Sequence, residues 1–217
     1  VKLLLKKDGV FIVQFLYMKS IVENTAFDQI YHEHLLYYNL VTLERLLNKY
    51  NLEIFDCNLE VVHGGQMVAY INHCGRRKKT KRYLNFLKKE IRSGCNNINY
   101  YIKFKKKVEN LKAKNLKFLN TAKKNNKTIF GIGAPAKGNT LLNYFKINKK
   151  IITKLLEKNS MRKNLYAPGS HIPIVLEQEE KKIPDIYYVL AWNFKKEILK
   201  NFKKRKIKSV FYFPINT

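Results

Sequence analysis

The sequence predicts an α/β protein in which a small, incomplete sheet is followed by two helices and then by a parallel sheet. Three observations support this: apolar runs of strand length near both ends, helical spacing of apolar residues in the middle, and strands alternating with helices after residue 128. The chain has 217 residues with 46% hydrophobic and 13% aromatic content, which is enough for a packed core and unlike a disordered chain. We expect three parts, at residues 1–75, 76–127 and 128–217.

The first part begins with a strand and a helix. Residues 9–15 form a nearly continuous apolar run, which is typical of a buried parallel strand. Within residues 41–50 the apolar side chains recur with the spacing of a short amphipathic helix, and Asn39 lies where it can cap the start of that helix.

A hairpin is expected to end the first part. Residues 52–62 and 66–72 have the pattern of two strands, and His63-Gly64-Gly65 between them is a turn, because paired glycines accept positive φ angles. A strand, a helix and a hairpin make only part of a sheet. We therefore expect the missing strands upstream of Val1.

Residues 76–127 are rich in Lys and Asn and predict two helices, separated by Gly94 and Asn96-Asn97. We interpret both as solvent-facing connector helices; the alternative is a coiled-coil site for a partner. Apolar positions of the first helix are Tyr83, Phe86, Leu87 and Ile91, and those of the longer second helix are Ile102, Val108, Leu111, Leu116 and Leu119.

The third part alternates between the two kinds of element. Strands are predicted at 128–130, 151–156, 185–191 and 209–213, and helices at 139–145 and 194–202. This alternation implies a parallel sheet with right-handed crossovers.

The charge of the chain is strongly positive. Lys plus Arg number 43 against 16 Asp plus Glu, a net charge of +27, which would suit nucleic acid or an anionic membrane. However, 36 of the basic residues are Lys and only 7 are Arg, and base-edge and bidentate phosphate recognition favour Arg. Lys, Asn, Ile, Tyr and Phe also share AT-rich codons. We therefore attribute most of the surplus to genome composition and expect no specific nucleic-acid partner.

Features of membrane and secreted proteins are missing from the sequence. No apolar run approaches the roughly 20 residues of a membrane-spanning helix, and the start of the chain is too short and too charged for a signal peptide. The chain does not begin with Met, which suggests a fragment. Three cysteines without C-x-x-C spacing favour a reducing, cytoplasmic setting.

A glycine turn is the first candidate site. A predicted strand leads through Gly131-x-Gly133 into a helix, the arrangement that presents backbone N–H groups to phosphate, and Glu157 ends the next predicted strand, where a dinucleotide fold places an acid for ribose. The six-residue fingerprint is met only with Ala136 in its last position. Asn139 replaces the lysine of a P-loop, so we reject an ATPase. The alternative is a tight turn that binds no ligand.

The second candidate site is Tyr31-His32-Glu33-His34, four polar side chains between apolar neighbours. In an extended stretch Tyr31 and Glu33 would share one side, whereas in a helical turn Tyr31 and His34 would face together. A carboxylate beside imidazoles can orient one ring for proton abstraction. We expect this tetrad to line a cleft facing Gly133; a hydrogen-bonded structural segment is the alternative. No spacing indicates a metal site.

These residues carry a resemblance to one family. The chain resembles the S-adenosylmethionine-dependent C-methyltransferases that act on nucleotide-linked deoxyketosugars, and the match runs through nearly the whole chain in order. The matching segments are Phe27-Asp28-Gln29-Ile30-Tyr31-His32-Glu33-His34, His63-Gly64-Gly65, Gly131-Ile132-Gly133-Ala134-Pro135-Ala136-Lys137-Gly138-Asn139-Thr140-Leu141-Leu142-Asn143-Tyr144, Pro168-Gly169-Ser170-His171-Ile172-Pro173-Ile174 and Ala191-Trp192-Asn193-Phe194.

The resemblance implies an enzyme of three domains: a zinc-binding module, a methyltransferase domain and a Rossmann-like domain, with the sugar nucleotide between the last two. Residues 1–75 would be the end of the methyltransferase domain, 76–127 the connector helices and 128–217 the Rossmann-like domain. The zinc module and the glycine-rich loop that holds S-adenosylmethionine would both be absent from this chain. A smaller departure is Glu157-Lys158-Asn159-Ser160, where the family shows an Asp-x-Asn-Pro type of segment.

The resemblance also implies roles for single residues. A base removes the proton beside the 4-keto group, and the resulting enolate carbon takes the methyl group. His34 is the expected base, with Tyr31 and Glu33 orienting it or steadying the enolate oxygen. The alternative function is a nucleotide-binding or assembly domain without chemistry, and packing at the sheet edge is the alternative role for two of the binding residues, His171 and Trp192. The residues expected to bind the nucleotide-diphosphate deoxyketosugar are Gly131, Gly133, Lys137, Asn139, His171, Trp192 and Asn193.

Overall fold

A computed structural model of the chain describes residues 1–60 and 65–215. The chain folds into two compact units. Unit 1 comprises Val1–Ala26 and His34–Lys106, and unit 2 comprises Phe27–Glu33 and Lys107–Thr217. A short excursion of the chain, residues 27–33, thus belongs to the second unit. The division into methyltransferase remnant, connector helices and Rossmann-like domain stays a prediction.

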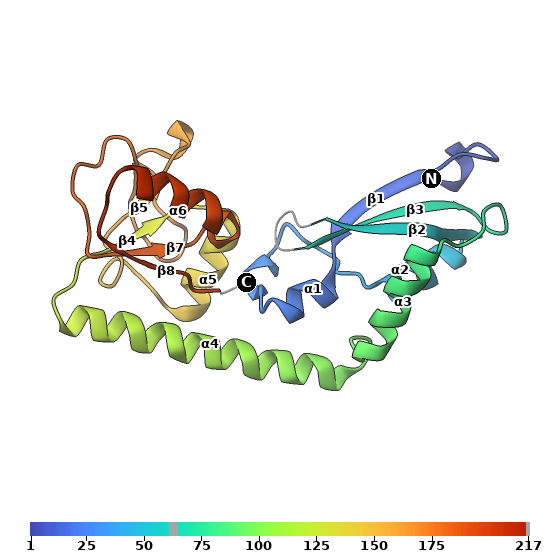
Figure 1. Ribbon diagram of the computed structural model, residues 1–217, viewed down its shortest axis with the longest axis horizontal. Coiled ribbons are helices and arrows are strands. Elements are labelled where there is room, and N and C mark those ends of the chain that lie inside the picture. The colour runs from blue at the N-terminus through green and yellow to red at the C-terminus, as the bar shows by residue number, and fades with distance from the viewer. Residues whose placement is uncertain (61–64, 216–217) are drawn as a thin grey trace. The chain divides into compact units, whose positions relative to one another are not determined.

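Unit 1 is built on a three-stranded antiparallel sheet in the order β1-β3-β2, drawn at the N-terminal end of the chain in Figure 1. The strands are β1 (Phe11–Leu16), β2 (Leu52–Glu60) and β3 (Gln66–His73), so the predicted hairpin strands are confirmed. Its turn stays a prediction, since His63 and Gly64 lie outside the described residues.

The prediction of a buried parallel strand at residues 9–15 is wrong. β1 pairs antiparallel with β3 and lies at the edge of the described sheet. Its side chains alternate: Ile12 and Gln14 are exposed, whereas Val13 packs against the core. A nearly continuous apolar run therefore does not distinguish a strand buried on both faces from an edge strand buried on one face.

Among the described residues, unit 1 contains the α-helices α1 (Met18–Glu23), α2 (Leu40–Asn48) and α3 (Lys81–Ser93) and the first part of α4 (Ile98–Lys124). The predicted helix α2 is confirmed, with Asn39 as its N-cap and the Asn39 N–H donating to Thr42 Oγ1. Gly94 ends α3 in the left-handed conformation, with a φ of 71°. The buried residues of the core are Tyr17, Leu40, Leu43, Leu47, Leu52, Ile54, Cys57, Met67, Ala69, Ile71 and Tyr83.

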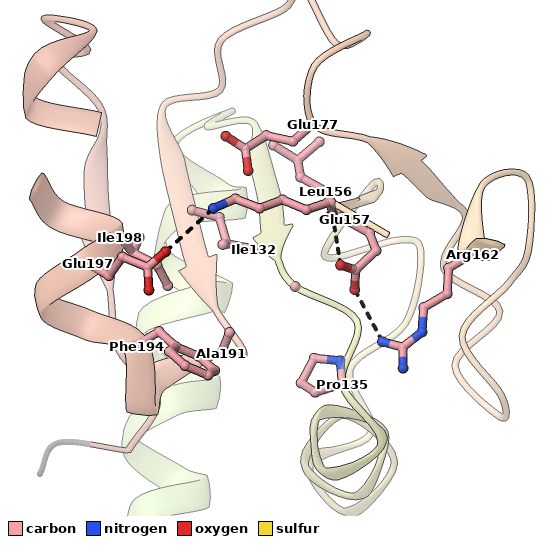
Figure 2. Close-up of a pocket in the computed structure, with 12 residues that line it drawn as sticks. Ile132, Pro135, Leu156, Glu157, Arg162, Glu177, Ala191, Phe194, Glu197 and Ile198 are labelled. Atoms are coloured by element: carbon pink, nitrogen blue, oxygen red, sulfur yellow. Dashed lines mark hydrogen bonds and ion pairs between the residues drawn. The ribbon is translucent and has the colours of Figure 1, made fainter. Parts of the chain in front are cut away.

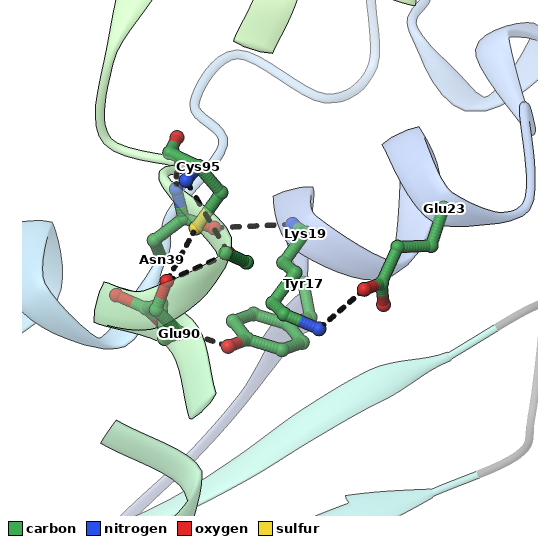
Figure 3. Close-up of polar contacts among 7 residues, drawn as sticks. Tyr17, Lys19, Glu23, Asn39, Glu90 and Cys95 are labelled. Atoms are coloured by element: carbon green, nitrogen blue, oxygen red, sulfur yellow. Dashed lines mark hydrogen bonds and ion pairs between the residues drawn. The ribbon is translucent and has the colours of Figure 1, made fainter. Parts of the chain in front are cut away.

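A buried carboxylate on α3 ties this unit together. Glu90 is fully buried and accepts hydrogen bonds from the Tyr17 hydroxyl (2.7 Å) and from the backbone N–H groups of Leu40 (2.7 Å) and Val41 (2.9 Å). Figure 3 shows Glu90 and Tyr17 facing each other. Because the first N–H groups of a helix have no partner within it, Glu90 satisfies the start of α2. One face of α3 is therefore buried in unit 1.

Unit 2 contains the predicted parallel sheet, which is confirmed. Its five strands are all parallel and lie in the order β6-β5-β4-β7-β8. The strand predicted at 151–156 is shorter and later than expected, and β6 was not predicted. The strands are β4 (Ile129–Ile132), β5 (Leu155–Glu157), β6 (Ile174–Leu176), β7 (Ile186–Val189) and β8 (Val210–Tyr212).

Three α-helices accompany this sheet: the second part of α4 (Ile98–Lys124), α5 (Ala136–Phe145) and α6 (Lys195–Lys204). Short 3-10 helices are η1 (Lys2–Leu4) in unit 1 and η2 (Phe27–Gln29), η4 (Ser160–Arg162) and η5 (Trp192–Phe194) in unit 2. Buried Asn115 of α4 accepts a hydrogen bond from the Tyr188 hydroxyl (2.8 Å), and Phe118 stacks on Tyr212. These contacts fix α4 against β7 and β8.

Candidate functional site

The strand order creates a switch point at β4. The chain leaves β4 for β5 on one side and later returns to β7 on the other, so the loops after β4 and β7 flank a crevice at the carboxyl ends of the strands. Open α/β sheets bind ligands at such a position.

The glycine turn lies on one side of this crevice. Gly131 is buried within β4, where a Cβ atom would lie 2.4 Å from Leu155 Cδ2, so this glycine allows β4 and β5 to pack closely. Gly133 has a φ of 81°, and a Cβ atom there would lie 3.0 Å from the Cβ atom of Ala191. Ala191 lies two residues after the end of β7. The turn thus requires glycine at both positions for reasons of backbone and packing.

Glu157 at the end of β5 holds the glycine turn. Its Oε2 accepts from the Ala134 N–H (3.0 Å) and from Arg162 Nη1 (3.2 Å), and its Oε1 accepts from the N–H groups of Lys158 (2.8 Å) and Asn159 (3.2 Å). Burial alone would raise the pKa of Glu157, but the three backbone donors and the Arg162 charge outweigh it and lower this pKa. The carboxylate is therefore ionised and fully engaged in clamping the turn.

A pocket of about 310 Å³ opens between the glycine turn, the end of β5 and helix α6 (Figure 2). Its apolar lining comes from β4, β5 and α6, and charged side chains make up much of the rest of the lining. The lining residues are Ile132, Gly133, Pro135, Leu156, Glu157, Lys158, Arg162, Glu177, Ala191, Phe194, Glu197 and Ile198.

A buried polar cluster joins η2 to both loops of the crevice. Trp192 Nε1 donates to Asp28 Oδ2 (2.6 Å), and both residues are buried. Lys137 Nζ donates to Asn193 Oδ1 (2.6 Å) and lies 4.0 Å from the centre of the Trp192 ring. Phe27 stacks on Phe145 of α5 with ring centres 5.3 Å apart. These contacts attach the segment that leads to Tyr31 to the glycine-turn helix.

Both charges of this cluster are perturbed. Burial raises the pKa of Asp28 to about 6, against the opposing effects of the Lys137 charge and the Trp192 hydrogen bond. Burial likewise lowers the pKa of Lys137, and the charge of Asp28 opposes that shift. Asp28 Oδ1 is buried and meets no donor at hydrogen-bonding geometry among the described residues. Groups with pKa values perturbed in this way are more common at functional sites than elsewhere.

The tetrad does not adopt either conformation that we considered. Residues 31–33 form a turn, and the chain then continues without regular structure to Tyr38. Tyr31 and His34 are half-buried, whereas His32 and Glu33 are exposed. Tyr31, His32 and Glu33 are not among the residues that line the pocket beside Gly133, and His34 belongs to unit 1. That the tetrad lines a cleft facing Gly133 stays a prediction. The His34 ring makes an edge contact with Tyr37.

Three of the remaining predicted binding residues lie at the carboxyl edge of the sheet, whereas His171 precedes the parallel strand β6 and therefore lies at the opposite edge. Lys137 and Asn139 are on the first turns of α5, and Asn193 follows β7. His171 is exposed in the loop before β6 and has a φ of 53°. Trp192 is buried, as the packing alternative required, but it also carries the hydrogen bond to Asp28.

The sequence of the chain matches a known protein family. Residues 61–215 match the family described as the C-methyltransferase C-terminal domain. The chain belongs to that family. It is also 31% identical over 206 residues to the C-methyltransferase NovU of Streptomyces niveus, covering 94% of this chain and 49% of NovU. The chain therefore spans about half the length of this curated relative.

Methyltransferase families in general use S-adenosylmethionine. The turn from β1 into α1 passes through Tyr17 without a glycine, so the described residues of unit 1 form no glycine-rich donor loop at this turn. Within the described residues, no group of three or more His, Cys, Asp or Glu side chains is placed to hold a metal ion. Nor does the described part of the chain contain a helix both long and apolar enough to cross a membrane.

Several residues of the C-methyltransferase domain site were not identified from the sequence. Asp28 was part of the matching segment but had no assigned role, because its burial depends on Trp192, 164 positions away. Arg162 lies in a segment without any recognisable ligand motif. Phe194 ends the matching segment Ala191-Trp192-Asn193-Phe194 but had no assigned role.

Proposed function

We propose that this chain is the C-terminal part of an S-adenosylmethionine-dependent C-methyltransferase acting on a nucleotide-linked 4-keto-deoxysugar. The observation that supports this most is the attachment of residues 27–33 to unit 2. Asp28 binds Trp192, and Phe27 stacks on α5, so Tyr31 and Glu33 belong to the same unit as the glycine turn. This attachment supports a role of residues 27–33 in the same site as the glycine turn.

The proposed chemistry begins with removal of a proton. The 4-keto group acidifies the hydrogen on the neighbouring sugar carbon, and a ring nitrogen of His34 takes that proton. The electron pair of the broken C–H bond forms the enolate, whose oxygen carries the negative charge. The Tyr31 hydroxyl donates to that oxygen, while Glu33 orients the imidazole. In the complete enzyme S-adenosylmethionine would supply the methyl group to the enolate carbon, with its sulfur–methyl bond broken and S-adenosylhomocysteine released.

The substrate-binding part of the proposal concerns the crevice of unit 2. Lys137, at the second position of α5, places a cation near a helix N-terminus, where a diphosphate is favoured. Gly133, Asn139 and Asn193 complete the proposed contacts to the sugar nucleotide in this crevice, whereas His171 lies at the opposite edge of the sheet. Gly131 contributes by allowing the close packing that shapes the turn.

The test is His34→Asn in the complete protein that contains this chain, with methyl transfer followed from labelled donor. Because a positioned proton-transfer group contributes about a hundred- to ten-thousand-fold, we expect turnover to fall by at least about a hundredfold while substrate binding stays nearly unchanged. His32→Asn, at the exposed neighbouring imidazole, is the matched control and should keep its turnover. Turnover of His34→Asn within threefold of wild type would disprove the assignment.

The second candidate is a nucleotide-binding domain without chemistry, which the pocket beside the glycine turn favours. It predicts that nucleotides bind to the chain and that His34→Asn changes nothing that can be measured. The same pair of variants therefore decides between the two functions.

A further inference from the structure

The pocket beside the glycine turn is nearly balanced in charge, although the chain carries a net charge of +27. Its lining holds three carboxylates, Glu157, Glu177 and Glu197, and two cations, Lys158 and Arg162. A surface built to attract a diphosphate would instead concentrate cations. The lining of the pocket is thus unusual within this chain.

Each of these charges already has a partner. Arg162 binds Glu157 (3.2 Å), Lys158 lies 3.8 Å from Glu197, and Glu177 accepts from Arg205 (2.7 Å). The Ala134 N–H, which the glycine turn would otherwise present to a phosphate, donates to Glu157. The pocket lining therefore offers neither an unpaired cation nor this backbone donor to a phosphate group.

The apolar lining of the pocket combines one half-exposed aromatic ring with buried aliphatic side chains. Phe194 is 50% exposed at the start of α6, whereas Ile132, Leu156 and Ile198 are buried around it. Figure 2 shows the ring of Phe194 beside Ala191 at the edge of the pocket. An aromatic ring that is half exposed beside buried aliphatic side chains can stack on a flat ring of a ligand.

The ion pair between Lys158 and Glu197 can open for a ligand. Both side chains are more than half exposed, and Figure 2 shows this pair as a dashed line reaching Glu197. Exposed ion pairs contribute little, about 0–1 kcal/mol. Once separated, Glu197 can accept a hydrogen bond from a hydroxyl group and Lys158 can donate one.

We propose that this pocket is a nucleoside subsite, in which the base stacks on Phe194 and the sugar hydroxyls bind Glu197 and Lys158. This inference rests on the proposed nucleotide-linked substrate and adds where its uncharged end binds. A pocket of about 310 Å³ lies at the lower end of the range for small-molecule sites, which suits one nucleoside rather than a whole nucleotide sugar. The diphosphate then lies outside the pocket.

The test titrates the 217-residue chain with thymidine and with uridine by calorimetry, alone and in the presence of inorganic pyrophosphate. We expect at least one nucleoside to bind with a Kd on the order of 1 mM or tighter, and pyrophosphate not to displace it. Phe194→Ala should weaken binding about tenfold through loss of stacking. Phe194→Trp should retain binding because it keeps a flat aromatic face.

Leu199→Ala is the matched control, since Leu199 is a partly exposed apolar residue of α6 outside the pocket lining. It should bind within twofold of wild type. The inference is overturned if neither nucleoside binds, if pyrophosphate competes, or if Phe194→Ala binds as tightly as Leu199→Ala. His34→Asn should leave nucleoside binding unchanged, so failure of the proposed methyl transfer with intact binding would reject the proposed reaction alone.

Discussion

At the scale of single residues, Asp28 is the side chain whose energetics are least expected. A buried carboxylate normally has all its oxygen atoms hydrogen-bonded, yet Asp28 Oδ1 meets no donor at hydrogen-bonding geometry among the described residues. Trp192 and the charge of Lys137 compensate only in part, so burial keeps the pKa of Asp28 raised, at about 6. The ionised side chain therefore opposes folding at neutral pH, which is expected of a group kept for function rather than stability.

Asp28→Asn tests this directly. Between about pH 4 and pH 6 the folded chain holds a proton on Asp28 that the unfolded chain has lost, so this group stabilises the fold at low pH and loses that effect as pH rises through 6. The asparagine resembles the protonated form. We expect the variant to be more stable than wild type near neutral pH by on the order of 1–3 kcal/mol, with the difference shrinking toward about pH 4.

Urea unfolding of both proteins at several pH values measures this difference. Asp8→Asn, at an exposed aspartate of unit 1, serves as the control and should show no such trend. A variant less stable than wild type across the whole range would mean that the Asp28 charge stabilises the fold after all.

At the scale of elements, the turn between β4 and α5 depends on one backbone conformation. Gly133 has a φ of 81°, and a Cβ atom there would lie 3.0 Å from Ala191 Cβ. Gly75 has a similar φ of 75°, but its Cβ would meet nothing within 4 Å. A side chain at either position would therefore be strained by the backbone, but only at Gly133 would it also be crowded.

Replacing each glycine with alanine separates these effects. Gly75→Ala should lose about 1 kcal/mol of stability from the left-handed backbone alone. Gly133→Ala should lose that amount and about 1 kcal/mol or more in addition, because crowding against Ala191 moves the loop after β7. Thermal melting followed by circular dichroism measures both, and equal losses would show that the space beside Gly133 is unimportant.

Elements were predicted well where a local pattern determines them. Helix α2 follows from apolar spacing with Asn39 before it, and the parallel sheet follows from alternating strands and helices. The direction of β1 did not follow, because its five apolar residues around Gln14 look alike in a buried parallel strand and in a half-covered edge strand. β6 has only three residues, too few for a period to be recognised.

The candidate site was predictable only in part, for the same reason. The glycine turn and Glu157 carry a local signal, since a strand, a glycine pair and an acid at the end of the next strand are all visible in the sequence. The contacts that complete the site join residues far apart, such as Lys137 with Asn193 and Asp28 with Trp192. No local pattern specifies such pairs.

At the scale of the whole molecule, the chain spans about half the length of NovU. The reaction that we propose has two steps, proton removal and methyl transfer. Proton removal beside the ketone requires a base and a bound sugar but no methyl donor. It can therefore be examined separately from methyl transfer, without the methyl donor.

The most direct measurement is the incorporation of solvent deuterium into a nucleotide-linked 4-keto-deoxysugar, followed by NMR at the carbon next to the ketone. We expect the wild-type chain and His32→Asn to accelerate this exchange at least about a hundredfold over buffer, and His34→Asn to exchange at close to the buffer rate. Exchange by His34→Asn as fast as by wild type, or no acceleration by wild type, would contradict the claim that His34 is the base.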